Sequence, residues 1–165
     1  MEILYAPWRA EYVGQEEVSE EGCIFCIQLA HNTDEKYFIL GRYKTTFIML
    51  NRYPYNAGHV LILPLEHQAH LENLSQDTQQ ELMCLISQST VILKKELNAQ
   101  GINIGMNLGK AAGAGIPSHL HTHVLPRWLG DTNFLPTLGN VKQVSKSLDD
   151  LYLKLRPVFQ KITTS

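Results

Sequence analysis

Short apolar runs separated by turn residues mark the first part of the chain as rich in β-strands. Residues 37–40 and 45–50 have this composition, and the sequence GRYK between them suits a hairpin turn. A third run, 59–63, follows the turn sequence NRYPYNAG. These runs predict three strands in the first part of the chain.

The middle of the chain changes to helical spacing after Ser75, a residue type that often precedes the first turn of a helix. From there to Gly101, apolar residues recur every three or four positions: Leu82, Leu85, Ile86, Ile92, Leu93 and Leu97. This spacing predicts the main helix, packed on one face of the sheet. Residues 102–107 and 119–125 alternate again, which predicts two more strands joined by the Gly-rich loop GKAAGAGIP.

A further helix is predicted near the C-terminus, where one side carries Val144, Leu148, Leu151, Tyr152 and Leu155. Strands and helices without regular alternation indicate an α+β fold, with a five-stranded antiparallel sheet, a main helix on one face and a C-terminal helix. The pattern leaves open whether the last helix covers the core or forms a subunit contact. We expect an N-terminal arm over 1–22, a central domain over 23–134, and a C-terminal extension over 135–165 within the same single domain.

The chain's 165 residues are enough for one self-sufficient hydrophobic core. A net charge of −2 argues against a protein dedicated to binding duplex nucleic acid, which needs a concentrated positive field. The sequence shows neither a basic leader with an apolar run nor an apolar stretch of membrane length, so we expect a soluble, cytoplasmic protein. A small anionic substrate is compatible with this charge.

The most informative motif is SHLHTHVLPRW, in which His119, His121 and His123 occupy alternate positions. A β-strand sends alternate residues to one face, so this spacing predicts that the three imidazoles share a face. Such a row could bind a metal ion or supply a nucleophile with helpers. A zinc site made of all three is disfavoured, because same-face positions lie nearly 7 Å apart along a strand. Histidines that merely decorate a half-exposed strand are the remaining alternative.

The loop before these histidines contains Gly109, Gly113 and Gly115, which permit positive φ and leave backbone N–H groups free to surround an anion. It lacks the Gly-Lys-Ser/Thr order of a Walker A loop. A hairpin turn without a ligand is the simpler interpretation, and the neighbouring histidines favour phosphate binding. Asn51, at the end of a predicted strand, is either a turn residue or a ligand, since an amide can donate to and accept from a diol.

Two of the three cysteines form the motif Cys23-Ile24-Phe25-Cys26. Without a secretory leader, such a pair favours a metal site or a redox dithiol over a structural disulfide, and two unligated thiols are the other alternative. A tetrahedral zinc site would need two further nitrogen or sulfur ligands. Cys84 lies among apolar residues and is expected to pack in the core.

The histidine row, the Gly-rich loop and the upstream NRYPYNAGHVLILP together resemble the histidine triad (HIT) family of nucleotide hydrolases and transferases. The resemblance covers residues 23–134. Pro-Arg-Trp followed by GDTNF, and APWRAEYV ahead of the cysteine pair, are most similar to the bacterial diadenosine tetraphosphate phosphorylase branch. The resemblance implies a HIT-like sheet that pairs across a homodimer.

The resemblance also implies roles for individual residues. His121 would attack the α-phosphorus, His123 would donate to a phosphate oxygen or help the leaving group, and His59 would orient them. Asn51 would bind the ribose hydroxyls. The phosphate contacts would come from Asn107, Gly113, Gly115 and Ile116. Many family members have Gln and then Ser at the last two of these positions, so this chain would depend more on its backbone and on the Asn.

For the cysteine pair, the resemblance implies a structural zinc ion. In zinc-bearing relatives the third ligand is a histidine after the GHxLxxP strand and the fourth is the first histidine of the row, which here are His67 and His119. His70 is a close alternative to His67, because both lie in the same predicted turn. The ion would tie the N-terminal arm to the catalytic strand without taking part in bond breaking.

The implied function is nucleotidyl transfer through a covalent nucleotidyl-histidine, with phosphorolysis of diadenosine tetraphosphate to ADP and ATP as the leading hypothesis. Hydrolysis of dinucleoside polyphosphates or nucleoside phosphoramidates is the alternative among enzymes. A nucleotide-binding module without turnover is an alternative of another class, because a fold alone does not establish activity. The expected partners are a small-molecule nucleotide and a second copy of the chain, without nucleic acid or membrane, and no redox or organic cofactor is expected.

Overall fold

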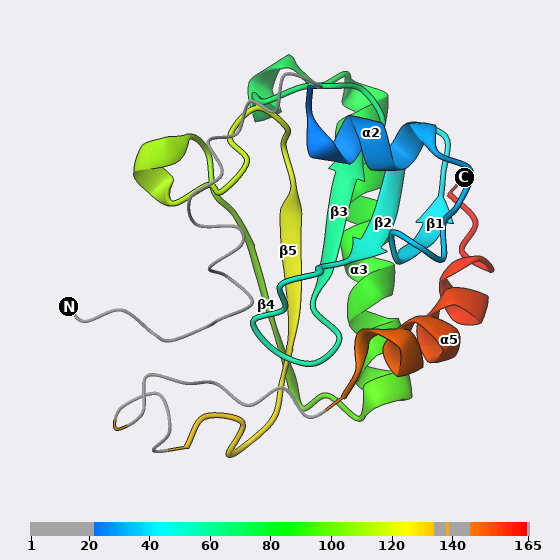
Figure 1. Ribbon diagram of the computed structural model, residues 1–165, viewed down its shortest axis with the longest axis vertical. Helices are drawn as coiled ribbons and strands as arrows, with labels where there is room; N and C mark the ends of the chain where they lie inside the picture. The colour runs from blue at the N-terminus through cyan, green and yellow to red at the C-terminus, as the bar shows by residue number, and fades with distance from the viewer. Residues whose placement is uncertain (1–21, 134–137, 139–145, 165) are drawn as a thin grey trace.

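The computed structural model describes residues 22–133, 138 and 146–164 of the chain. In these residues five strands form one antiparallel sheet in the order β1-β2-β3-β5-β4 (Figure 1). They are β1 (Ile39–Arg42), β2 (Thr46–Leu50), β3 (Val60–Pro64), β4 (Gly101–Met106) and β5 (Thr122–Arg127). The α+β fold predicted from the sequence is confirmed. The expected N-terminal arm falls almost entirely outside the described residues.

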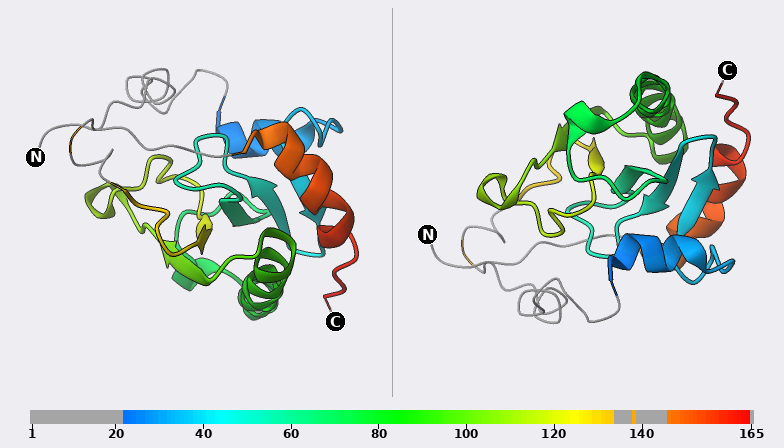
Figure 2. Two further views of the ribbon diagram at one scale, coloured as in Figure 1. Left: turned by 90° about the horizontal axis from the view of Figure 1, so that it is seen from below. Right: turned by 90° about the horizontal axis from the view of Figure 1, so that it is seen from above.

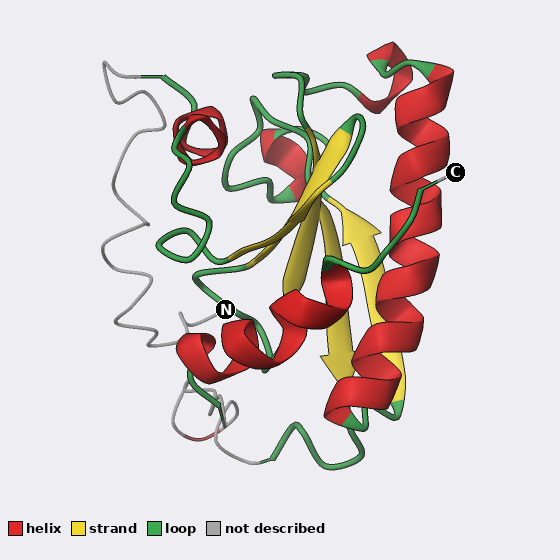
Figure 3. Ribbon diagram, turned by 90° about the vertical axis from the view of Figure 1, so that its right-hand side faces the viewer, coloured by secondary structure: helices red, strands yellow, loops and turns green. Residues whose placement is uncertain are grey.

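Within the described residues, three α-helices pack around this sheet: α2 (Ile24–Ala30), α3 (Gln76–Leu97) and α5 (Leu148–Phe159). Helices α2 and α3 lie on opposite faces of the sheet (Figure 2). Helix α5 lies beside β1 and also contacts α3, which runs along the sheet (Figure 3). Two short 3₁₀ helices, Leu71–Asn73 and Lys110–Ala112, lie in the connections before α3 and after β4.

Both faces of the central strands are covered. All five residues of β2 and all five of β3 are buried, so alternate side chains enter two different apolar cores. The larger core lies between the sheet, α3 and α5, and includes Ile48, Leu50, Val60, Ile62, Leu85, Leu93, Val124 and Leu155. The smaller core lies under α2 and consists of Phe25, Ile39, Phe47, Met49, Leu61 and Leu63.

Helix α3 begins as the sequence predicts, because the Ser75 side chain accepts a hydrogen bond from the backbone N–H of Thr78. It ends at Leu97 rather than near Gly101, since Asn98 turns to a left-handed conformation with φ of 53°. The expectation that Cys84 packs in the core is wrong. Its side chain is half-buried, lies in neither apolar core, and accepts a hydrogen bond from Gln88.

Helix α5 covers the larger core, which decides one question that periodicity left open. Leu151, Tyr152, Leu155 and Phe159 are all buried in that core. The Tyr43 hydroxyl donates to the Phe159 carbonyl at 2.9 Å, which ties the end of the helix to the β1–β2 turn. The helix begins after Ser147, whose side chain caps it, so the predicted helical face starts at Leu148 and Val144 lies outside the described residues.

The strand that carries the histidine row begins later than predicted. Pairing with both neighbours starts at Thr122, opposite Ile62 on β3 and Met106 on β4. The residue two places earlier, Leu120, donates its N–H to the Gln68 carbonyl at 2.7 Å instead of to a strand. The prediction that 119–125 forms one strand is therefore wrong at its start, and only His123 of the three histidines lies within β5.

Candidate functional site

The three alternating histidines divide into two groups. His119 is completely buried, and its Nδ1 lies 3.4 Å from the Sγ of Cys23. His121 and His123 lie together instead, with ring centroids 5.0 Å apart. His119 packs against the Phe25 ring of α2, as His121 does, whereas Leu120 and Val124 lie in the larger core, so the predicted alternation holds across the row. The prediction that the three imidazoles share a face is confirmed, since His123 pairs with Leu61 of the smaller core, but the row serves two clusters instead of one.

His121 is held in one tautomer by its own chain. Its Nδ1–H donates to the His119 backbone carbonyl at 2.8 Å, so in the neutral ring the lone pair is on Nε2. The side chain is only 8% exposed, and burial lowers the pKa of His121 despite that hydrogen bond. The Phe25 ring of α2 packs against it at 5.5 Å between centroids. A neutral imidazole with one free nitrogen is the form that acts as a nucleophile.

His123 is held in the opposite tautomer by a hydrogen-bond chain. The Tyr55 backbone N–H donates to His59 Nδ1 at 3.1 Å, so His59 carries its proton on Nε2. That Nε2–H lies 2.9 Å from His123 Nδ1 and donates to it, which leaves the proton of neutral His123 on Nε2. Burial and the neighbouring His121 lower the pKa of His123 to about 4, which keeps the ring neutral. Its Nε2 is buried and has no hydrogen-bond partner among the described residues.

A buried donor without a partner normally loses free energy, about 1–3 kcal/mol, unless a ligand supplies the acceptor. The Nε2–H of His123 is therefore suited to a ligand oxygen. The Tyr55 ring stacks on His123 with centroids 5.7 Å apart and also contacts His59 at 4.7 Å. The turn after β2 thus contributes both a backbone donor and a ring to the histidine pair.

Asn51 lies beside this chain at the end of β2. Its Oδ1 accepts from the Tyr53 backbone N–H at 2.9 Å, which is the contact expected of a turn residue. Its Nδ2 lies 3.3 Å from His59 Nδ1 and so supports the same tautomer. The structure brings Asn51 to the histidines, and its side chain here serves the turn.

The Gly-rich loop follows β4 and leads back to the histidines. Gly109 and Gly113 have φ of 82° and 88°, which only glycine adopts easily, and no atom lies within 4 Å of a Cβ built at either position. The Asn107 amide spans the loop and donates to the Gly113 carbonyl at 3.5 Å. Gly115 is exposed, while the Ile116 side chain packs against the smaller core, so a ligand would meet the Ile116 backbone.

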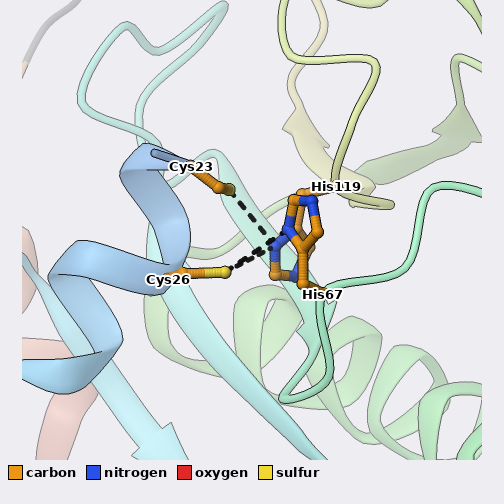
Figure 4. A group of neighbouring side chains, drawn as sticks. All are labelled: Cys23, Cys26, His67 and His119. Carbon is orange, nitrogen blue, oxygen red and sulfur yellow. Dashed lines mark hydrogen bonds between the residues drawn. The ribbon is translucent and has the colours of Figure 1, made fainter. Parts of the chain in front are cut away.

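A second cluster brings Cys23, Cys26, His67 and His119 together, with one ligand atom of each within 4.8 Å of all the others (Figure 4). The first two residues lie at the start of α2, His67 follows β3, and His119 precedes β5. His70, the alternative to His67, is not in the cluster. It is 65% exposed, and its Nδ1 lies 3.6 Å from a Glu72 oxygen.

The cluster has the spacing of a tetrahedral zinc site. Zinc bonds of about 2.3 Å to sulfur and 2.0–2.1 Å to nitrogen imply S···N separations of roughly 3.5 Å. The observed separations are 3.4 Å for Cys23 to His119, 3.6 Å for Cys26 to His119, and 3.4 Å for Cys26 to His67. The His119 Nε2–H donates to the Pro64 carbonyl at 3.0 Å, so its Nδ1 lone pair faces the sulfur atoms. The residues present fit a zinc ion.

Sequence reasoning gave no role to one further group near the site. Asp131, in the GDTNF motif, accepts hydrogen bonds from Arg127 at the end of β5 and from Asn56 in the turn before β3. The sequence did contain one indication of the ion pair: Arg127 and Asp131 are four residues apart and carry opposite charges. Nothing in the sequence showed that Asn56 joins them.

Comparison with known proteins identifies the family. Residues 32–128 match the HIT domain, so the chain belongs to the HIT family. The AP-4-A phosphorylase of Mycobacterium tuberculosis (strain CDC 1551 / Oshkosh) is 31% identical over 156 residues, which cover 91% of this chain and 80% of that protein. The bis(5'-adenosyl)-triphosphatase of Saccharomyces cerevisiae (strain YJM789) is 33% identical over 95 residues, 57% of this chain and 45% of that protein.

The fold is shared with solved HIT structures. A Zn-bound histidine triad family protein from Mycobacterium smegmatis superposes with a TM-score of 0.68 at 24% identity, covering 84% of this chain and 93% of that chain. At this identity the likeness concerns the fold alone. Within the described residues, no helix combines the length and the apolar composition that crossing a bilayer requires.

Proposed function

We propose that this protein transfers an adenylyl group from a dinucleoside polyphosphate to an acceptor through a covalent bond to His121. The leading reaction is phosphorolysis of diadenosine tetraphosphate to ADP and ATP. The relative named AP-4-A phosphorylase supports this choice, because the match to it extends over 91% of the chain. The observation that carries the proposal is the pair of opposite tautomers, with a free lone pair on His121 Nε2 and a buried N–H on His123 Nε2.

In the first step, the Nε2 lone pair of His121 attacks the α-phosphorus and forms a P–N bond. The bond from that phosphorus to the bridging oxygen breaks, and ATP leaves with the electron pair. The N–H of His123 donates a hydrogen bond to the oxygen on which negative charge develops. The His121 ring becomes positively charged, and the His119 carbonyl, which already accepts from its Nδ1–H, stabilises that charge.

In the second step, an oxygen of inorganic phosphate attacks the same phosphorus. The P–N bond breaks, its electron pair returns to His121 Nε2, and ADP is released. Water in place of phosphate would give AMP, so the same histidines serve a hydrolase. The Gly109–Gly113 part of the loop, with the Asn107 amide, would bind the phosphate oxygens through N–H donors. Asn51 would reach the ribose after exchanging one of its turn contacts.

The experiment is product analysis by ion-exchange chromatography after incubation with diadenosine tetraphosphate, with and without inorganic phosphate. ADP plus ATP formed only with phosphate supports the phosphorylase, and AMP plus ATP without phosphate indicates the hydrolase. His121→Asn should abolish both, whereas His70→Asn, at an exposed histidine outside the site, should retain wild-type rates. Nucleotide binding without turnover in the wild-type protein would favour the binding module.

We also propose that Cys23, Cys26, His67 and His119 hold a structural zinc ion. The ion would supply a fixed tetrahedral centre that joins α2 to the residues before β5. Its support is the donor set and the S···N distances, together with the Zn-bound neighbour of the same fold. The ion does not take part in bond breaking.

We further propose a homodimer formed along β4. This strand is an edge of the sheet, and its Ile104 side chain is 51% exposed. The other edge, β1, has α5 packed beside it. Light scattering coupled to gel filtration should give twice the chain mass, and Ile104→Lys should shift the measured mass toward that of the monomer.

A cytoplasmic location and the absence of a nucleic-acid partner remain predictions.

A further inference from the structure

A buried carboxylate joins the segments that carry His59 and His123. The Asp131 side chain is 8% exposed and accepts five hydrogen bonds. The donors are Arg127 Nε at 2.7 Å, Arg127 Nη2 at 2.9 Å, Asn56 Nδ2 at 2.8 Å, the Trp128 backbone N–H at 3.1 Å and the Thr132 hydroxyl at 3.1 Å. Hydrogen bonds from Arg127 hold the pKa of Asp131 well below its usual range, so the group stays charged.

One of these donors controls the turn that ends at His59. The Asn56 side chain is 6% exposed, and its Nδ2 donates to both Asp131 and the Pro126 carbonyl of β5. Its backbone carbonyl accepts from the His59 N–H at 3.2 Å. Between them lies Gly58, with φ of 75°, where a Cβ would collide with Leu97 of α3. The side chain of Asn56 therefore anchors the turn to Asp131 and β5, and its backbone carbonyl holds the N–H of His59.

The other donors fix the strand that carries His123. Arg127 ends β5, and its Nη1 also donates to Asn103 on β4 at 2.8 Å. Asp131 thus joins the end of β5 to the turn before β3. His59 comes from that turn and His123 from that strand, and their 2.9 Å contact depends on the spacing between the two segments.

We propose that Asp131 is a positioning residue for the transfer reaction, which holds the 51–59 turn against β5 so that His59 keeps the donor N–H of His123 aimed at the leaving group. An error of about 1 Å in placing a reacting group can lower a rate about 100-fold. The catalytic consequence rests on the proposed function, whereas the geometric claim does not.

The first test measures steady-state kinetics of Asp131→Asn with diadenosine tetraphosphate and phosphate. The amide cannot accept all five donors, so we expect kcat to fall about 10- to 100-fold with KM within about threefold. Thr132→Val is the matched control. Thr132 is exposed, and although its hydroxyl donates to Asp131, it belongs neither to the 51–59 turn nor to β5. The control variant should keep the wild-type kcat, and an unchanged kcat in Asp131→Asn would overturn the proposal.

A double-mutant cycle separates positioning from general damage. If Asp131 acts through His123, then Asp131→Asn combined with His123→Asn should be no slower than His123→Asn alone, within about twofold. If the two substitutions instead lower kcat independently, so that their fold-losses multiply in the double variant, Asp131 does not act through His123. Asn56→Ala cuts the link to the turn while keeping the Arg127 pair. It should reproduce the loss in kcat, and it decides the matter if Asp131→Asn does not fold.

A spectroscopic measurement tests the geometry without turnover. Long-range ¹H–¹⁵N spectra report which imidazole nitrogen carries the proton. His123 should be an Nε2–H tautomer in the wild-type protein and in Thr132→Val, and a mixture in Asp131→Asn. An unchanged tautomer in Asp131→Asn refutes the positioning role. If the His123 tautomer differs between the wild-type protein and Asp131→Asn but the wild-type protein shows no turnover, the proposed function is refuted and the positioning role is not.

Discussion

The His121 Nδ1–H donates to the backbone carbonyl of His119 at 2.8 Å, so the residue that faces the cysteine pair also sets the tautomer of the proposed nucleophile. Both ring nitrogens of His119 have contacts of their own, Nε2–H with the Pro64 carbonyl and Nδ1 with the sulfur atoms. The metal cluster and the transfer site are therefore adjacent along the chain and share one peptide. Occupancy of the cluster should influence both stability and turnover.

Metal removal is the direct test of this relationship. Protein purified without chelator should contain about one zinc per chain, and chelation should lower the Tm by about 5–15 °C, since structural zinc contributes free energy of folding. Turnover should fall with it and return on adding Zn²⁺. Elemental analysis and thermal unfolding measure these effects.

Two single substitutions identify the ligands. Cys26→Ser should lose most of the zinc, whereas Cys84→Ser, on α3 and outside the cluster, should bind it as the wild-type protein does. The same comparison of His67→Asn with His70→Asn separates the two candidate histidines. Full zinc occupancy in His67→Asn would contradict the ligand set.

The two tautomers predict different losses at the neighbouring histidines. His121→Asn removes the attacking atom, so kcat should fall roughly 10⁴-fold or more. His123→Asn removes one hydrogen-bond donor, because the shorter amide does not reach the position of Nε2, and kcat should fall about 10²- to 10³-fold. Isothermal titration with a non-hydrolysable dinucleotide should show binding in both variants. A milder effect in His121→Asn than in His123→Asn would reverse the assigned roles.

Sequence periodicity predicted the sheet and the main helix because both depend on local patterns. The Ser75 cap and the apolar spacing of α3 are short-range features, and so are the β-rich runs of β2 and β3. Helix α2 was not predicted, because its seven residues are too few to show a helical period. The cysteine pair at its start was interpreted for its chemistry and not for its secondary structure.

The histidine row shows why the site was only partly predictable. Alternation correctly placed Thr122 and Val124 in the interior and His123 on the other face. It also placed His119 on that face, but it could not show the contacts of His119 with Pro64 and the cysteine pair, which are distant in sequence. The link from Asp131 to Asn56 spans 75 residues for the same reason, and no local pattern reveals it.

The Gly-rich loop allows a test of substrate binding that leaves the histidines untouched. Gly113 has φ of 88° and open space around a built Cβ, so Gly113→Ala would strain the backbone without a steric clash, at about 1–2 kcal/mol. If the loop binds phosphate oxygens, KM should rise about 3- to 30-fold as its N–H groups turn away, with a smaller change in kcat. Steady-state kinetics decide this, and a KM equal to that of the wild-type protein would remove the loop from the binding site.

Glu81 gives a stability prediction far from the transfer site. Its carboxylate accepts hydrogen bonds from the backbone N–H groups of Lys44 and Thr45 and from the hydroxyls of Thr45, Thr46 and Thr164. Burial alone would raise the pKa of Glu81, but these hydrogen bonds outweigh it and lower the pKa below 4.5. The ionised group therefore joins α3 to the β1–β2 turn and to the residues after α5.

Glu81→Gln should lower the free energy of unfolding by about 2–4 kcal/mol at pH 7, because the amide cannot accept all of these donors. A lowered pKa in the folded state means that the carboxylate's contribution is complete above the unfolded pKa and is lost as pH falls through the folded one. The difference between wild-type and variant should thus stay constant from pH 7 to about 5.5 and shrink below 4.5. Urea unfolding at several pH values measures it, with Glu72→Gln, at a 73% exposed side chain, as the control that should change little. A difference that grows as the pH falls would contradict the assigned direction of the Glu81 shift.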